Sequence, residues 1–164
     1  MNYSVYFDIA RDGYQGLSAV SNSFLALLLL AVIIIISIKC IKEKTFGNIA
    51  VLILLILPSV SFLVWDWRYV SDKNKEYSLI LHRGAYKTVE GRVRNVRVLY
   101  GKHDMQYFSV NGVNFKITEN TGSGGFNRTI IKGGPLRENV YVRLSYIESY
   151  GDKIILRVEI AQQK

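Results

Sequence analysis

The chain has 164 residues, a formal net charge of +8 and a single cysteine, Cys40. One cysteine excludes an intramolecular disulfide and any metal site built on cysteines. The positive surplus is concentrated between Arg83 and Lys164, where 14 lysines and arginines stand against 7 acidic residues. A basic domain of this size attracts anions such as phosphates, nucleotides, nucleic acid or lipid head groups, although such a surplus also serves solubility.

The N-terminal part of the chain differs in composition from the rest. A polar and aromatic tail, residues 1–18, precedes two almost uncharged stretches, Ala19–Ile38 and Gly47–Trp67. Each stretch is close to the ~20 apolar residues that cross a bilayer core. The sequence therefore predicts a two-helix transmembrane hairpin over residues 19–67, in a multi-pass membrane protein.

The orientation of this hairpin stays open. Three lysines in the short connection, Lys39, Lys42 and Lys44, favour a cytoplasmic connection. Positive residues near the other ends of the two stretches favour the opposite orientation. They are Arg11, Arg68, Lys73, Lys75 and Arg83. The side of the membrane on which the following domain lies is therefore uncertain.

Residues 68–85 are a polar juncture, in which Tyr77–Leu81 is either an extra strand or a continuation of the helix. Residues 86–164 alternate between apolar and polar positions, which is typical of β-strands. The alternation slips at Asn95, which predicts a β-bulge that keeps three arginines on one surface. Asn111-Gly112 predicts a tight type I′ hairpin. The expected strands are Thr88–Tyr100, Gln106–Val110, Val113–Thr118, Val140–Ile147 and Lys153–Ala161.

A 21-residue insert, Glu119–Asn139, separates the first three expected strands from the last two. Five strands divided in this way resemble the OB-fold, a small Greek-key barrel. The expected fold class is thus membrane-anchored: an N-terminal two-helix transmembrane hairpin followed by an all-β small barrel, OB-like, with five to six antiparallel strands. The glycine-rich part of the insert, Gly122–Gly134, is expected to be a lid or disordered. Backbone amides of Gly122–Gly125 are a further candidate for holding a phosphate.

The outward positions of the expected strands and the insert combine arginines with tyrosines. Basic residues interleaved with aromatic ones favour the binding of a polyanion that carries bases. Lys116 adds a further positive charge to this surface. The candidate ligand-binding residues are Arg92, Arg94, Arg97, Tyr107, Arg128, Tyr141, Arg143 and Arg157.

Catalytic and metal-binding patterns are not found in the sequence. Neither His82 nor His103 stands in a motif, and no further ligands are spaced for a metal. Glu90 and Glu159 are a possible carboxylate pair, but flanking arginines favour ordinary cross-strand ion pairs. We therefore expect no enzyme, no catalytic residues, no cofactor and no metal.

The layout of a two-helix anchor followed by a small basic β domain resembles the membrane effectors of bacterial cyclic-oligonucleotide antiphage signalling (CBASS). The resemblance implies an antiviral defence protein whose barrel binds a cyclic dinucleotide. It also implies a multi-pass protein of the bacterial inner membrane with a cytoplasmic barrel. Its helices would form a homo-oligomer and disrupt that membrane, with lipids as partners. The alternative is a non-enzymatic scaffold similar to NfeD-type proteins, whose OB-like domain binds protein partners or lipid head groups. A phage-exclusion or immunity protein is a third possibility.

Overall fold

The computed structural model describes residues 2–14, 31–32, 34, 46–101, 104–118, 124–149 and 151–162, without the side chains of 46–59, 62–63 and 66. The chain divides into two compact units. One unit joins Met1–Leu17 to Asp72–Lys164, and the other is Ser18–Ser71. The first unit contains the β-sheet and every candidate site residue.

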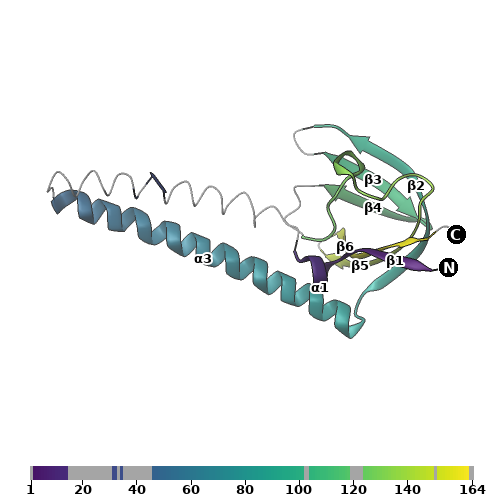
Figure 1. The fold of residues 1–164 in the computed structure, drawn as a ribbon, viewed down its shortest axis with the longest axis horizontal. Coiled ribbons are helices and arrows are strands. Elements are labelled where there is room, and N and C mark those ends of the chain that lie inside the picture. The colour runs from purple at the N-terminus through teal and green to yellow at the C-terminus, as the bar shows by residue number, and fades with distance from the viewer. Residues whose placement is uncertain are drawn as a thin grey trace. The chain divides into compact units, whose positions relative to one another are not determined.

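The sheet has six antiparallel strands in the order β1-β6-β5-β2-β3-β4 (Figure 1). The β-sheet character expected for the second half of the chain is therefore confirmed. The strands are β1 (Tyr3–Asp8), β2 (Lys87–Leu99), β3 (Met105–Val110), β4 (Val113–Thr118), β5 (Tyr141–Ser149) and β6 (Asp152–Ala161).

Strand β2 joins the two halves of the sheet, since its first part pairs with β5 and its second part with β3. The register with β3 shifts between Arg94, opposite Ser109, and Arg97, opposite Tyr107. Asn95 lies at this shift with a φ of 55°. The β-bulge predicted at Asn95 is thus confirmed, and Arg94 and Arg97 are both exposed.

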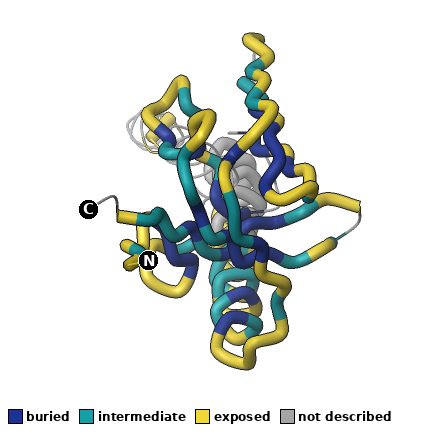
Figure 2. The backbone as a smooth tube through the Cα atoms, turned by 90° about the vertical axis from the view of Figure 1, so that its right-hand side faces the viewer, coloured by how far each residue is buried: buried dark blue, intermediate teal, exposed yellow. Residues whose placement is uncertain are grey.

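Alternating aliphatic side chains form the core. Val142, Leu144, Leu156 and Val158 on β5 and β6 are fully buried, as is Val93 on β2. Figure 2 shows these buried stretches in dark blue along the strands of the sheet. Ser145 on β5 is also buried, beside an irregularity in the pairing of β5 with β6 between Ser145 and Tyr146.

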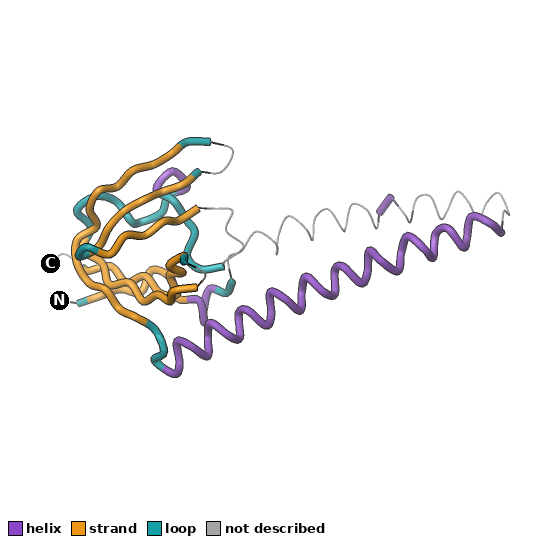
Figure 3. The backbone as a smooth tube through the Cα atoms, turned by 180° about the vertical axis from the view of Figure 1, so that it is seen from behind, coloured by secondary structure: helices purple, strands orange, loops and turns teal. Residues whose placement is uncertain are grey.

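The helices are α1 (Ile9–Asp12), α3 (Phe46–Arg83) and the 3₁₀ turn η1 (Ile130–Lys132), drawn purple in Figure 3. Tyr77–Leu81 lies inside α3, so it continues the helix and forms no strand. Within the first unit, Tyr77 stacks on Tyr14 with ring centroids 6.1 Å apart, and Leu81 is buried. The helix ends at Arg83, and Gly84 follows it with a φ of 68°, which suits a glycine.

The insert packs against the sheet over its described residues, 124–139, and is no open lid there. Thr129 and Leu136 are fully buried. The buried side chain of Gln106 on β3 holds two points of the insert. Its Nε2 donates to the Leu136 carbonyl at 2.6 Å, and its Oε1 accepts from the Ile130 N–H at 2.8 Å.

The expected fold class, a membrane-anchored two-helix hairpin followed by an OB-like barrel, is wrong. The tail at residues 1–18 contributes the edge strand β1, which pairs with β6, and the six-stranded sheet is open between β1 and β4. The second expected span, Gly47–Trp67, forms only part of a 38-residue helix that continues through a polar segment to Arg83. The first expected span, Ala19–Ile38, lies outside the described residues except for residues 31, 32 and 34.

Among the described residues, no helix combines the length and the apolar character needed to cross a membrane. This finding contradicts the predicted two-span protein of the bacterial inner membrane.

Candidate functional site

Arg92 and Arg94 lie on the exposed face of β2 and converge on one neutral residue. Arg92 Nη1 donates to the Asn139 carbonyl at 3.0 Å, and Arg94 Nη1 donates to Asn139 Oδ1 at 2.6 Å. Asn139 is itself held by β2, because its N–H donates to the Val93 carbonyl at 2.9 Å. A guanidinium carries five N–H donors, so most donors of this arginine pair are left for a ligand.

Further along β2, Arg97 faces Tyr107 on β3, and Tyr107 faces Lys116 on β4. The row thus places an aromatic ring between two cations. It borders a groove of about 460 Å³ that we call the Tyr107 groove. The groove is lined by Asn95, Arg97, Leu99, Tyr107, Phe108, Asn114 and Phe115.

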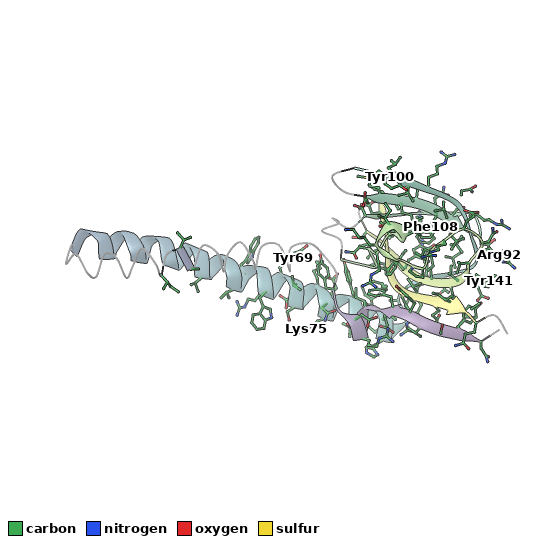
Figure 4. The ribbon with its side chains drawn as sticks, turned by 45° about the horizontal axis from the view of Figure 1, so that its top comes forward. Tyr69, Lys75, Arg92, Tyr100, Phe108 and Tyr141 are labelled. Carbon is green, nitrogen blue, oxygen red and sulfur yellow. The ribbon has the colours of Figure 1, made fainter. Side chains whose placement is uncertain are left out.

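The arginine pair and the Tyr107 groove follow one another along the same strand. Figure 4 labels Arg92 and Tyr141 toward one end of the sheet, and Tyr100, just after β2, toward the other. Neither Arg92, Arg94 nor Arg97 has a carboxylate partner within the described part of the chain.

The arginines of β5 and β6 are neutralised by carboxylates. Arg143 Nε lies 2.9 Å from Glu90 Oε2, and Arg143 Nη1 lies 3.9 Å from Glu159 Oε2. Arg157 Nε donates to Asp8 Oδ2 at 2.8 Å. Such pairs connect neighbouring strands, and they leave these two arginines poorly suited to an additional anion.

The two remaining candidate residues also have protein partners. The hydroxyl of Tyr141 donates to Glu90 Oε1 at 3.4 Å. Arg128, in the insert, donates to the Tyr6 hydroxyl at 3.4 Å. The structure therefore brings together Arg92, Arg94, Arg97 and Tyr107, and it places Arg128, Tyr141, Arg143 and Arg157 in other contacts.

Glu90 is the centre of a cluster that attaches β1 to the sheet. The Tyr3 hydroxyl donates to Glu90 Oε1 at 2.5 Å, and the Arg143 guanidinium lies 4.1 Å from the centre of the Tyr3 ring. Desolvation and the hydrogen bond to Glu90 raise the pKa of Tyr3 to about 12. The hydrogen bonds from Tyr3 and then Arg143 lower the pKa of Glu90. This carboxylate is thus held ionised as an ion-pair partner.

The Tyr3–Glu90 contact predicts a loss of stability in strong base. Because the pKa of Tyr3 is raised from 10.0 to about 12, its stabilisation is complete below pH 10 and is lost as pH rises through about 12. In a titration followed by tyrosinate absorbance, Tyr3→Phe is expected to remove a step near pH 12. The control Tyr100→Phe, at an 82% exposed tyrosine, is expected to keep that step. A step that survives Tyr3→Phe contradicts the assignment.

The glycine run of the insert does not form a phosphate cradle where it is described. A Cβ on Gly124 would lie 1.6 Å from Cε2 of Tyr14, and one on Gly125 would lie 2.6 Å from Cγ2 of Ile154. These two glycines therefore allow close packing. Gly122 lies outside the described residues.

Metal chemistry has no site in the described part of the chain, where no three or more His, Cys, Asp or Glu side chains gather. His82 is exposed at the end of α3, and His103 lies outside the described residues. Sequence reasoning missed Asn139, which orients the arginine pair, and the groove residues Asn95 and Asn114. No signal marked Asn139, because its role depends on the path of the insert beside β2.

No family model, curated protein or solved structure matches the chain. The arginine pair and the Tyr107 groove lie along one strand, β2. Together they offer guanidinium donors for an anion and an aromatic surface for a ring.

Proposed function

We propose that this protein is a non-enzymatic binding module for a phosphate-bearing nucleotide. The observation that supports it is the convergence of the Arg92 and Arg94 guanidiniums on the neutral Asn139. Guanidinium groups bind phosphate through paired, charge-assisted hydrogen bonds. Since Asn139 takes one donor from each arginine and brings no negative charge, a phosphate meets two positioned cations.

The contrast with the rest of the sheet supports the choice of strand. Arg143 and Arg157 are paired with carboxylates at 2.9 Å and closer, and each pair reduces the local positive potential. Along β2, residues on the same face repeat about every 6.7 Å. Successive phosphates of an extended nucleotide backbone are spaced comparably, so this strand suits more than one phosphate.

The ligand class follows from combining the arginine pair with the Tyr107 groove. Tyrosine rings stack on nucleobases, and every base offers such a face. The resemblance to effectors of cyclic-oligonucleotide signalling makes a cyclic dinucleotide the first ligand to test, because it unites two phosphates with two bases. On this proposal the protein is a signal receptor in antiphage defence.

The test is isothermal titration of the full chain with cyclic di-GMP, cyclic di-AMP and base-free tripolyphosphate. The double variant Arg92→Ala/Arg94→Ala is expected to lower the affinity for whichever cyclic dinucleotide binds by at least about a hundredfold, because it removes two charged hydrogen-bond donors worth about 1.5–3 kcal/mol each.

The matched control is Lys75→Ala/Arg83→Ala, which removes the same charge from exposed positions of α3 within the unit that contains the sheet. It is expected to change the affinity less than about threefold, through long-range electrostatics alone. Equal losses in both double variants, or no binding of any of the three probes, would overturn the proposed function.

A second candidate, a non-enzymatic scaffold that assembles copies of this chain through α3, is favoured by exposed apolar side chains. Val64 is 52% exposed and Trp67 is 77% exposed on this helix. Buried aromatic anchors such as tryptophan dominate many interfaces. Light scattering of the full chain tests it: Trp67→Ser is expected to lower the assembly state, whereas the arginine double variant leaves it unchanged.

A further inference from the structure

The residues of the Tyr107 groove suit a site that binds a nucleobase and discriminates between bases. Its exposed surface includes Tyr107, 37% exposed, and Leu99, 56% exposed. In register with Tyr107 stand Arg97 on one side and Lys116 on the other. A planar ring stacked on Tyr107 therefore has a cation near each of two edges.

We propose that the Tyr107 groove binds a guanine base, in preference to adenine, as the base subsite of the nucleotide module. The inference rests on the proposed function, in which Arg92 and Arg94 hold phosphate. In a cyclic dinucleotide the subsite takes one of the two bases.

Hydrogen-bond complementarity selects guanine. Guanine presents two acceptors, O6 and N7, on one edge, and an arginine or lysine donating to both is the commonest specific contact to a base. Adenine presents an amino donor beside N7 on the same edge. The Arg97 guanidinium carries donors only and has no hydrogen bond or ion pair within the described residues, so it matches guanine and meets a donor in adenine.

Two amides complete the polar lining of the groove. Asn95 Nδ2 donates to Ser109 Oγ at 3.1 Å, which fixes the orientation of the amide and leaves its oxygen as an acceptor. Asn114 is exposed on β4, and no hydrogen bond of its side chain is found within the described residues. Amide oxygens accept from N–H groups. Guanine has two such donors, N1–H and its 2-amino group, at positions where adenine has none.

The experiment compares the full chain and its variants with the same three probes. The wild-type chain is expected to bind cyclic di-GMP about tenfold or more tightly than cyclic di-AMP, the discrimination that one bidentate contact supplies. Arg97→Gln, which replaces a donor-only group by an amide, is expected to reduce this ratio to about threefold or less.

Tyr107→Ala is expected to lower the affinity for cyclic di-GMP at least tenfold through lost stacking, whereas Tyr107→Phe keeps the ring and the affinity. The control Tyr100→Ala removes an 82% exposed tyrosine outside the groove and is expected to leave the affinity unchanged. Tripolyphosphate, which has no base, is expected to bind Tyr107→Ala and wild type equally.

The outcomes separate the two proposals. Equal binding of the two cyclic dinucleotides, or unchanged affinity in Tyr107→Ala, overturns the guanine subsite while losses in Arg92→Ala/Arg94→Ala keep the phosphate site. Absence of binding for all three probes overturns both proposals. Circular dichroism of each variant checks that the sheet is intact.

Discussion

Replacing Gln106 by methionine is expected to lower the free energy of unfolding by about 2–6 kcal/mol. Methionine is close to glutamine in volume, so the change removes the amide without opening a cavity. Gln106 is fully buried, and its amide satisfies the carbonyl of Leu136 and the N–H of Ile130. Each backbone group that loses its buried partner costs roughly 1–3 kcal/mol.

The measurement is chemical denaturation of Gln106→Met, with Gln162→Met as the matched control at an exposed position after β6. The control is expected to change stability by less than about 0.5 kcal/mol. Because the anchored insert also carries Asn139, the first variant is further expected to weaken cyclic dinucleotide binding at the arginine pair. Stability equal to that of wild type would show that the Gln106 contacts contribute nothing.

Gly134→Ala is expected to cost about 3 kcal/mol, because the backbone of the insert leaves no room for a methyl group. A Cβ at Gly134 would lie 2.2 Å from the Arg128 carbonyl oxygen and 2.7 Å from that of Thr129. Both atoms belong to the backbone, and the Gly134 N–H donates to the Thr129 carbonyl at 2.8 Å. Accommodation therefore requires the whole turn to move.

The neighbouring Gly133 is the control, because alanine there changes the backbone strain without any steric clash. Gly133 has a φ of 79°, and a Cβ there meets nothing within 4 Å. Gly133→Ala is therefore expected to cost only about 1–2 kcal/mol, the penalty of a left-handed conformation. Denaturation midpoints that rank these two alanine variants in the opposite order would contradict the packing described for the insert.

Local patterns predicted the strands of the second half of the chain well. The Asn111-Gly112 turn is confirmed by positive φ values of 46° and 79°, and β4 has the predicted bounds, Val113–Thr118. The bulge at Asn95 was also visible, because a slip in alternation is a local signal. Each of these features depends on residues close together in the sequence.

Features that depend on distant residues were not predicted. Strand β1 has no hairpin partner nearby, and its pairing with β6 joins opposite ends of the chain. The insert is poor in apolar residues, yet a single buried glutamine on another strand holds it. The second apolar stretch is helical as predicted, and its continuation through Tyr77–Leu81 was one of two alternatives left open. The absence of a membrane-crossing helix among the described residues was not predicted.

The candidate site was predicted in part for the same reason. Alternation placed Arg92, Arg94 and Arg97 on one exposed face correctly, because it is a property of one strand. It assigned Arg143 and Arg157 to the same surface, although pairing brings carboxylates of other strands beside them. Cross-strand register decides which arginines have a carboxylate partner. The alternation within one strand does not reveal that register.

The pairing of β1 with β6 also determines when the sheet can be completed during synthesis. Ser4 and Ile160 are hydrogen-bonded although they are 156 positions apart, and the Gln162 N–H donates to the Asn2 carbonyl at 2.9 Å beside the two marked termini (Figure 1). At ribosomal rates of 5–20 residues per second, the first strand made waits roughly 8–30 s for its partner. A ribosome that stops before β6 therefore leaves β1 without the strand with which it pairs.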